Sequence, residues 1–79
     1  MAMIESKIKD FFIEKRRATG LENDTDLFKG GYIDSLFAFE MVVYLEETFG
    51  VRIPDKAITE DNFRTIGAIA ALIEAQRHG

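Results

Sequence analysis

The run over residues 35–49 constrains the fold of this chain more than any other segment. It contains neither glycine nor proline, and Gly50 follows it directly, as is typical of a helix and its stop signal. At helical spacing five of its apolar residues fall in one arc of roughly 100°. These predicted core residues are Ala38, Met41, Val42, Leu45 and Phe49. A helix with one apolar face has to bury that face against further elements.

Two more helices are predicted, over residues 3–17 and 63–77, because apolar residues recur at helical spacing in both. The residues expected to be buried are Ile4, Ile8, Phe11, Phe12 and Ile13 in the first helix, and Phe63, Ile66, Ile69, Ala70 and Ile73 in the last. Lys15, Arg16 and Arg17 fall in the last turn of the first helix, where cations suit the helix dipole, and Gly20 follows its end. We interpret this basic cluster as a solvated helix end rather than as a binding patch.

The connection over residues 18–33 is long, and it carries both turn residues and apolar residues. We expect the apolar ones to be pinned against the core, and they are Leu21, Leu27, Phe28, Tyr32 and Ile33. Long loops of this kind tend to be functional. Asp24 and Asp26 lack the remaining ligands of a calcium-binding loop, so we predict no metal site.

The second connection is shorter. Pro54 biases Ile53 away from the helical region, and residues 55–60 are expected to form one or two helical turns with Ile58 facing inward. The expected caps of the last helix are Asp61 and Asn62, and the residues that indicate close helix contact are Gly67, Ala68 and Ala71. The sequence therefore predicts one all-α domain over residues 1–79, a small four-helix bundle with three longer helices, one short third helix and a long loop between helices 1 and 2.

Charge and composition exclude several classes of function. The formal net charge of −4 disfavours a nucleic-acid partner. The chain has no cysteine, and its one histidine, His78, is next to last, so neither a Ser-His-Asp nor a Cys-His arrangement can form and we predict no enzyme activity. The N-terminus reaches charged residues at once, and no apolar run approaches the length of a membrane span. We therefore expect no signal peptide, no membrane association and a cytoplasmic location.

The outward face of the 35–49 helix is acidic but not purely polar. Leu36, Glu40, Val43 and Glu47 cluster within about 60° on the side opposite the core face, and Glu46 lies nearby. The segment over residues 34–49 holds four acids and no base. Because a purely solvated face has little need of two apolar residues, we interpret this face as a docking strip for a basic partner surface.

Residues 30–36 (Gly-Gly-Tyr-Ile-Asp-Ser-Leu) bring the chain to the start of this helix and leave a hydroxyl there. Two interpretations are open. Either Asp34 or Ser35 caps the helix, as these residue types commonly do, or Ser35 carries a phosphodiester. A helix N-terminus suits an anion because its free N–H groups and its dipole stabilise negative charge.

The Asp34-Ser35-Leu36 motif resembles the attachment motif of acyl carrier proteins, whose serine is esterified with 4′-phosphopantetheine from coenzyme A. The resemblance covers nearly the whole chain. Besides the amphipathic first helix, the similar segments are residues 26–28, 31–36, 45–50, 53–55 and 62–66. Several are short, but their order and separations within 79 residues make the match specific.

The resemblance implies a role for each matching residue. Ser35 would hold the arm, whose thiol bears an acyl or aminoacyl group as a thioester, and Asp34 would serve the phosphopantetheinyl transferase that attaches it. The residues implied in partner binding are Leu36, Glu40, Val43, Glu46, Glu47, Asp55 and Ile58, of which the last two also border the arm or its cargo. The implied partners are the transferase and the acyl- or aminoacyl-loading and elongating enzymes, docking through basic patches on a monomeric carrier.

Some positions depart from the common fatty-acid pattern. Ile33 precedes the motif, Phe37 and Phe39 follow it, and the first helix is unusually basic. The Ile-Asp-Ser-Leu form is more similar to discrete carriers of specialised polyketide, hybrid peptide or D-alanyl pathways. We therefore expect such a carrier, with a housekeeping fatty-acid carrier or a helical interaction module without the arm as alternatives. The sequence does not identify the cargo.

Overall fold

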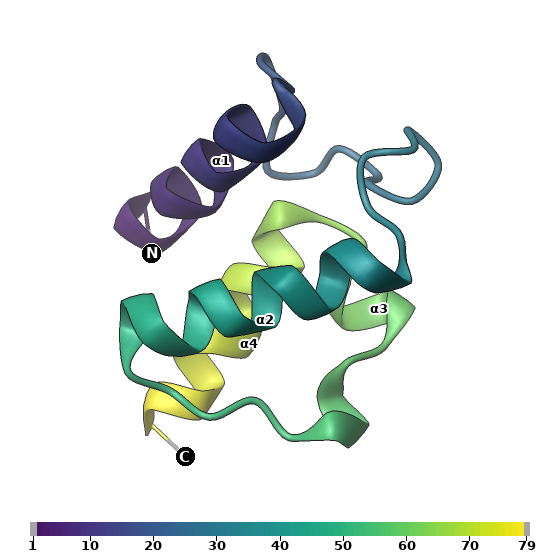
Figure 1. Cartoon of the computed structure of the whole chain (residues 1–79). Coiled ribbons are helices and arrows are strands. Elements are labelled where there is room, and N and C mark those ends of the chain that lie inside the picture. Colours follow the sequence, from purple (N-terminus) through teal and green to yellow (C-terminus); the bar gives the residue numbers. More distant parts are fainter. Residues whose placement is uncertain (1, 79) are drawn as a thin grey trace.

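Helices make up all the regular structure of residues 2–78, the part of the chain that the computed structural model describes (Figure 1). In chain order they are α1 (Ala2–Arg16), α2 (Ser35–Phe49), the 3₁₀ turn η1 (Asp55–Ala57), α3 (Glu60–Phe63) and α4 (Ile66–His78). This confirms the predicted all-α bundle with three longer helices and a short one between the second and the last. Among the described residues, no helix combines the length and the apolar character that crossing a bilayer requires.

Helix α2 forms over the predicted residues because local signals fix both of its ends. Asp34 caps its N-terminus, and Gly50 adopts the left-handed conformation (φ 65°) that ends it, donating its N–H to the carbonyl of Glu46 at 3.0 Å. Four of the five predicted core residues of α2 are buried, and Phe49 is half-buried. Phe37 joins them with 3% of its surface exposed, so the apolar face is wider than the sequence pattern indicated.

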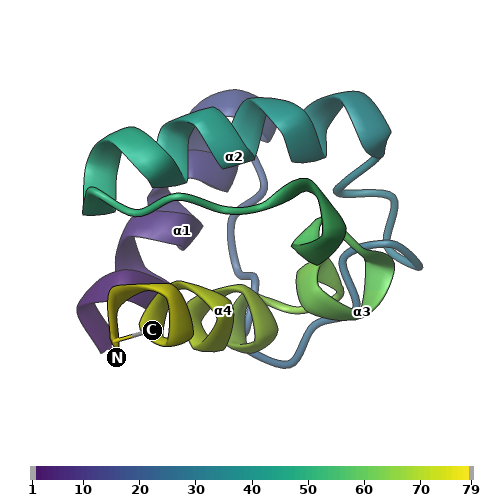
Figure 2. The same ribbon diagram turned by 90° about the horizontal axis from the view of Figure 1, so that it is seen from below.

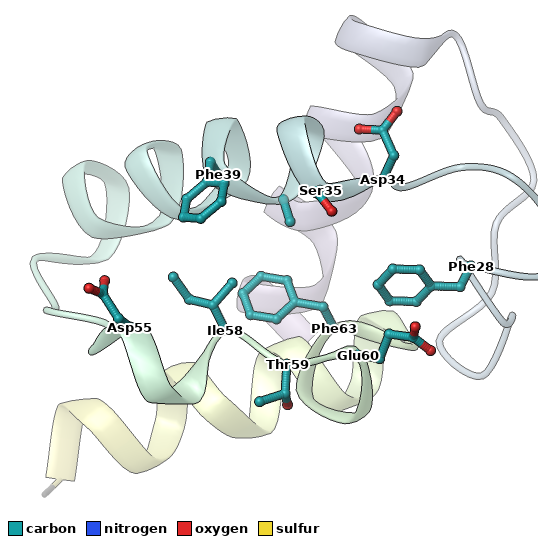
Figure 3. Close-up of a pocket in the computed structure, with 10 residues that line it drawn as sticks. Phe28, Asp34, Ser35, Phe39, Asp55, Ile58, Thr59, Glu60 and Phe63 are labelled. Carbon is teal, nitrogen blue, oxygen red and sulfur yellow. The ribbon is translucent and has the colours of Figure 1, made fainter.

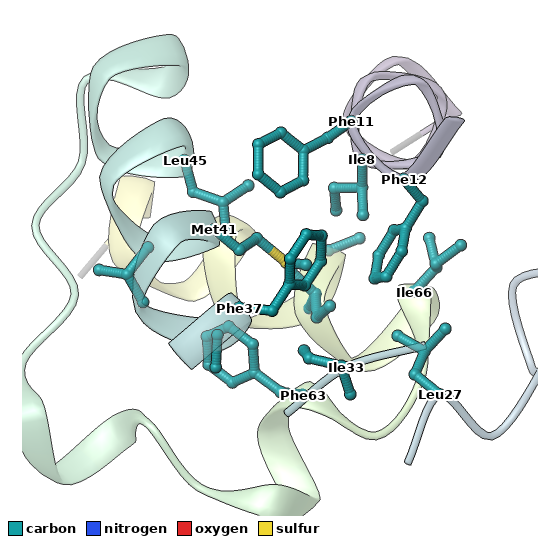
Figure 4. Close-up of a cluster of buried hydrophobic side chains, with 14 of the residues drawn as sticks. Ile8, Phe11, Phe12, Leu27, Ile33, Phe37, Met41, Leu45, Phe63 and Ile66 are labelled. Carbon is teal, nitrogen blue, oxygen red and sulfur yellow. The ribbon is translucent and has the colours of Figure 1, made fainter. Parts of the chain in front are cut away.

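The longer helices enclose a single apolar core. Helix α1 runs antiparallel to α2, since its last turn reaches Asp34 while the carbonyl of Lys7 accepts from the hydroxyl of Tyr44. Seen from below, α2 and α4 form two layers, and α3 lies at one end between them (Figure 2). The largest side chains with under 2% of their surface exposed are Ile8, Phe12, Leu27, Met41, Leu45, Phe63, Ile66, Ile69 and Ile73. Figure 4 shows part of this core, with Phe12, Met41 and Phe63 among its members.

The long loop between α1 and α2 is anchored, as its apolar residues predicted. Three of these residues are buried (Leu21, Leu27 and Ile33), and two pack half-buried against the core (Phe28 and Tyr32). The backbone also ties the loop down, because Leu27 N–H donates to Arg64 at 2.7 Å and Gly67 N–H donates to Asn23 at 2.9 Å. A Cβ on Gly67 would lie 3.3 Å from that Asn23 oxygen. The close approach predicted at Gly67 is therefore made to the loop and not to another helix.

The first helix ends one residue earlier than predicted. Arg17, and not Gly20, follows its last residue in the left-handed conformation, with φ at 54°. The N–H groups of Arg17 and Ala18 donate to the carbonyls of Ile13 and Phe12, at 2.9 and 3.3 Å, and these bonds hold the turn. The prediction that Ile13 is buried is wrong, because 44% of its surface is exposed on the outer side of α1.

The last predicted helix is in fact two helices. Phe63 belongs to α3, and α4 begins at Ile66, where the hydroxyl of Thr65 accepts from the N–H of Ala68 at 3.0 Å. The predicted caps Asp61 and Asn62 lie inside α3, whose cap is Thr59. The helical turn expected after residue 54 is present as η1, with Ile58 half-buried beyond it. The side chain of His78 lies outside the described residues.

Candidate functional site

Asp34 is the residue that caps α2. Its Oδ1 accepts the N–H of Phe37 at 2.8 Å, and its backbone is extended, as an N-cap requires. This hydrogen bond, together with the Arg16 guanidinium 3.4 Å from Oδ2, holds the pKa of the Asp34 carboxyl below its ordinary value of 3.8, against a smaller opposing effect of burial. Asp34 is therefore an anion at neutral pH.

Ser35 is the first residue of α2, and its side chain is exposed. Within residues 2–78, the hydroxyl of Ser35 makes no hydrogen bond, because Asp34 already supplies the cap. The sequence left open whether Asp34 or Ser35 caps the helix, and in the structure Asp34 does so. One stabilises the helix, and the other offers a free hydroxyl at the positive end of the helix dipole.

Ser35 lines a cavity of about 400 Å³ between α2 and the η1–α3 segment. Figure 3 shows Ser35 and Phe39 on one side and Ile58 and Phe63 facing them, with Phe28 from the long loop at one end. Phe39 is 56% exposed, so an aromatic ring stands at the open side of the cavity.

The charged residues that line this cavity are all acidic, namely Asp34, Asp55 and Glu60, and the carboxylate of Asp34 points away from it (Figure 3). Asp34 is paired with Arg16, and Glu60 is paired with Arg64 at 3.5 Å. Asp55 has no cationic partner within the described part of the chain. The cavity therefore offers apolar walls, negative rims and one unpaired carboxylate.

The predicted docking strip is exposed where the sequence placed it. Leu36 and Val43 are 72% and 55% exposed, and Glu40 and Glu47 are exposed beside them. Glu46 differs from these residues, because it is half-buried and accepts the N–H of Ile53 at 2.9 Å. Its carboxylate ties the connector after α2 to the helix.

Asp55 and Ile58, which were grouped with the partner-binding residues, line the cavity beside Ser35. The strip residues Leu36, Glu40, Val43 and Glu47 do not line that cavity. Apart from Glu46, the predicted partner-binding residues thus form two groups, one on the exposed face of α2 and one at the η1 turn beside the cavity.

An aromatic contact between α1 and α2 was not predicted. The Phe37 ring lies 5.3 Å from the rings of both Phe11 and Phe12, and the Arg16 guanidinium carbon lies 4.3 Å from the Phe37 centroid. Cation–π and aromatic contacts of this kind add to the energy of burial. A signal was available, because Phe37, Met41 and Leu45 recur every four residues along α2.

A second unpredicted group fixes the cavity end that holds Phe28. Arg64 contacts three carboxylates, those of Asp26, Glu60 and Asp61, at 3.6, 3.5 and 3.3 Å. Asp26 also accepts the N–H groups of Lys29 and Phe28, at 2.9 and 3.1 Å. The hydrogen bond from Lys29 is the main cause of a lowered pKa at Asp26, and the charge of Arg64 and the hydrogen bond from Phe28 also lower it. The pKa of Arg64 is raised, first by its hydrogen bond to Asp61 and then by the charges of the carboxylates around it. The network holds the loop against α3.

The arrangement fits a covalently attached anion with an apolar load. The free hydroxyl of Ser35 stands at a helix N-terminus, which suits an anion, and the adjoining cavity supplies apolar walls. Among the described residues, no group of three or more His, Asp or Glu side chains is placed to hold a metal ion.

Comparisons with known proteins agree with this geometry. The family profile described as "Phosphopantetheine attachment site" matches residues 8–73. D-alanyl carrier proteins of Streptococcus pyogenes, for example those of serotype M5 (strain Manfredo) and serotype M1, are 36% identical over 55 residues, which cover 70% of this chain and 70% of each relative.

A similar fold occurs in a solved structure described as a crystal structure of an FAD-dependent dehydrogenase. The match has a TM-score of 0.67 and 31% identity, and it covers 73% of this chain and 82% of that chain. The family profile and the D-alanyl carrier relatives indicate the same family, and this structure is consistent with it. The chain belongs to the phosphopantetheine carrier protein family, whose prosthetic group is a covalently bound 4′-phosphopantetheine.

Proposed function

We propose that this chain carries acyl or aminoacyl groups as thioesters on a 4′-phosphopantetheine arm esterified to Ser35, and that it presents them to biosynthetic enzymes. The observation that carries the proposal is the division of tasks at the head of α2. Asp34 caps the helix, and the exposed hydroxyl of Ser35 is left free beside an apolar cavity. A serine that merely capped the helix would have its oxygen engaged by an N–H group.

The surroundings of Ser35 favour a phosphodiester at this point. The first turn of α2 presents N–H groups and the positive end of its dipole to an attached anion. Asp34 would repel that anion, but the Arg16 guanidinium lies against its Oδ2 and offsets part of its charge. The arm supplies the thiol that this cysteine-free chain lacks, so the chain acts as a tether and partner enzymes perform the chemistry.

The cavity favours an apolar cargo that is neutral or bears an amine. Phe28, Phe39, Ile58 and Phe63 provide apolar surface, while every charged lining group is a carboxylate. A cargo that ends in a carboxylate would meet like charge, whereas the ammonium group of an aminoacyl thioester would face Asp55. The D-alanyl carrier relatives support the same choice. We therefore favour an aminoacyl cargo over the dicarboxylic extender units of polyketide synthesis.

Attachment is tested by incubating the chain with a broad-specificity phosphopantetheinyl transferase and coenzyme A. Intact-protein mass spectrometry should show one added arm, and peptide fragmentation should locate it on Ser35. The chain contains two serines, so Ser6→Ala is the matched control for Ser35→Ala. We expect addition to the wild type and to Ser6→Ala, and none to Ser35→Ala. Absence of any addition to the wild type would refute the proposal.

Cargo class is tested separately on the loaded carrier. Coenzyme A analogues with amide-linked alanyl, N-acetyl-alanyl or malonyl groups install hydrolysis-resistant cargos through the same transferase. We expect the alanyl form to raise the melting temperature more than the malonyl form does, and Asp55→Asn to reduce that difference. An equal or larger increase for the malonyl form would refute the aminoacyl assignment and leave the attachment result standing.

Partner enzymes fall into classes that the comparisons help to name. We propose the phosphopantetheinyl transferase, an aminoacyl-loading enzyme and, from the solved dehydrogenase structure, a flavin-dependent dehydrogenase that acts on the tethered group.

A housekeeping fatty-acid role predicts efficient loading by malonyl transferase. An interaction module without the arm predicts that Ser35→Ala keeps full biological function. A cytoplasmic location and a monomeric state remain predictions.

A further inference from the structure

Arg64 joins two walls of the Ser35 cavity without lining the cavity itself. It is the first residue after α3, and its guanidinium lies 3.6 Å from the carboxylate of Asp26 in the long loop and 3.5 Å from that of Glu60 on α3. Its backbone carbonyl also accepts the N–H of Leu27 at 2.7 Å. Both its side chain and its backbone therefore tie the long loop to α3.

The first consequence of these contacts concerns the position of Phe28. The Oδ1 atom of Asp26 accepts the N–H groups of Phe28 and Lys29 at 3.1 and 2.9 Å, while its Oδ2 atom faces Arg64. One carboxylate thus shapes the turn that carries Phe28 and anchors that turn to α3. The Phe28 ring lies at one end of the cavity and packs half-buried against the core (Figure 3). Through Asp26, Arg64 holds this ring as an end wall.

The second consequence concerns the charge inside the cavity. Figure 3 shows Asp55 at one end and Glu60 near Phe28 at the other. Arg64 offsets the charge of Glu60, whereas among residues 2–78 no ion pair reaches Asp55. Because opposite charges attract most strongly where no counter-charge competes, a cation in the cavity is drawn toward the Asp55 end.

We propose that Arg64 is a positioning residue that selects which carboxylate of the cavity recognises the cargo. By holding the Phe28 wall and offsetting Glu60, it directs the ammonium group of an aminoacyl thioester to Asp55. This inference rests on the proposed carrier function and adds to it a residue that does not line the cavity. Loss of the Arg64 charge would free Glu60 as a second, competing site for the ammonium group.

The first test uses the ¹⁵N-labelled chain without the arm and measures hydrogen exchange at single amides. Arg64→Gln should speed exchange at Phe28 and Lys29 by about two- to fivefold, the size of effect that an exposed ion pair provides. The amide of Phe37 donates to Asp34 in the same way, at 2.8 Å, and should exchange as in the wild type. Circular dichroism confirms that the variant is folded.

The second test measures an alanyl advantage at low ionic strength. This is the rise in melting temperature with the amide-linked alanyl cargo minus the rise with its neutral N-acetyl-alanyl counterpart. In the wild type, Asp55→Asn should remove most of the advantage and Glu60→Gln should leave it unchanged. In Arg64→Gln, Asp55→Asn should remove only about half of it, because two like carboxylates then share the ammonium group. Arg52→Gln is the matched control, since Arg52 is exposed and does not line the cavity, and it should behave as the wild type.

Four results would overturn the proposal. In the exchange test they are unchanged rates at Phe28 and Lys29 in Arg64→Gln, or an equal increase at Phe37. In the cargo test they are an equal loss from Glu60→Gln and Asp55→Asn in the wild type, or the same effect of Asp55→Asn in Arg64→Gln as in the wild type.

The tests also separate this proposal from the proposed function. A wild type without any alanyl advantage would overturn it together with the aminoacyl assignment. Attachment of the arm is decided by mass spectrometry alone, and the exchange test does not need the arm.

Discussion

The two phenylalanines that follow Ser35 provide a matched pair of perturbations on one helix. Phe37 is 3% exposed and lies against Phe11 and Phe12, whereas Phe39 is 56% exposed at the open side of the cavity. Truncating a buried phenylalanine to alanine costs about 3–5 kcal/mol. A domain of this length has a total stability of roughly 4–12 kcal/mol, so Phe37→Ala removes a large part of it.

The same numbers predict a shift in the melting temperature. At about 2.1 cal/mol/K of unfolding entropy per residue, 1 kcal/mol corresponds to about 6 °C for a chain of 79 residues, so Phe37→Ala should melt roughly 18–30 °C lower. Phe39→Ala should change the free energy of unfolding by about 1 kcal/mol or less, because its ring is mainly in solvent. Urea denaturation followed by far-UV circular dichroism measures both. Equal losses, or a loss under about 1 kcal/mol for Phe37→Ala, would refute the assigned orientation of α2.

Three further predictions follow from the other faces of the bundle. Leu45→Ala should destabilise by roughly 2–5 kcal/mol in the same urea assay, because Leu45 is fully buried; a cost near zero would contradict the core. Glu40→Lys and Glu47→Lys should reduce transfer by partner enzymes while keeping the melting temperature, and unchanged kcat/KM would remove the docking role from this face. The Asp34 carboxyl has a lowered pKa when folded, so its contribution to stability is complete above its unfolded pKa near 3.8 and is lost as the pH falls through the lower folded value. The melting temperature of the wild type should therefore fall more steeply than that of Asp34→Asn below about pH 4, and parallel curves would count against the cap.

Local signals explain why the sequence predicted α2 closely and narrowed its cap to Asp34 or Ser35. An aspartate before the helix, an uninterrupted amphipathic run and a glycine after it act within a few residues of one another. The break between α3 and α4 was missed because Phe63 continues the apolar spacing of α4 across it. The left-handed Arg17 was missed for another reason. Such a conformation is unfavourable for arginine, and two backbone hydrogen bonds hold the turn there.

In the candidate site, too, the local features could be predicted from the sequence and the contacts between distant residues could not. Asp34 and Ser35 are adjacent in sequence, so a motif is enough to predict a helix cap and to propose an attachment point there. The contact of Arg16 with Asp34 and Phe37 joins residues 18 to 21 positions apart, and no periodicity within one helix predicts it. The hydrogen bond from Ile53 to Glu46 likewise depends on how the chain returns after α2. Arg16 and Glu46, which the sequence analysis had treated as surface charges, therefore also hold parts of the fold together.

The separation of the two flanks of α2 matters for the proposed function. Because successive residues are rotated by about 100°, Ser35 and Phe39 face the cavity while Leu36 and Val43 lie on the docking strip, although all four lie within two to three turns. A partner bound to the docking strip would therefore leave the mouth of the cavity uncovered. The arm and its cargo could then leave the cavity for an active site without first breaking the docking contact. Weak, charge-dependent docking on one flank and apolar shelter on the other would thus operate independently, which is the property that a shuttle between several enzymes requires.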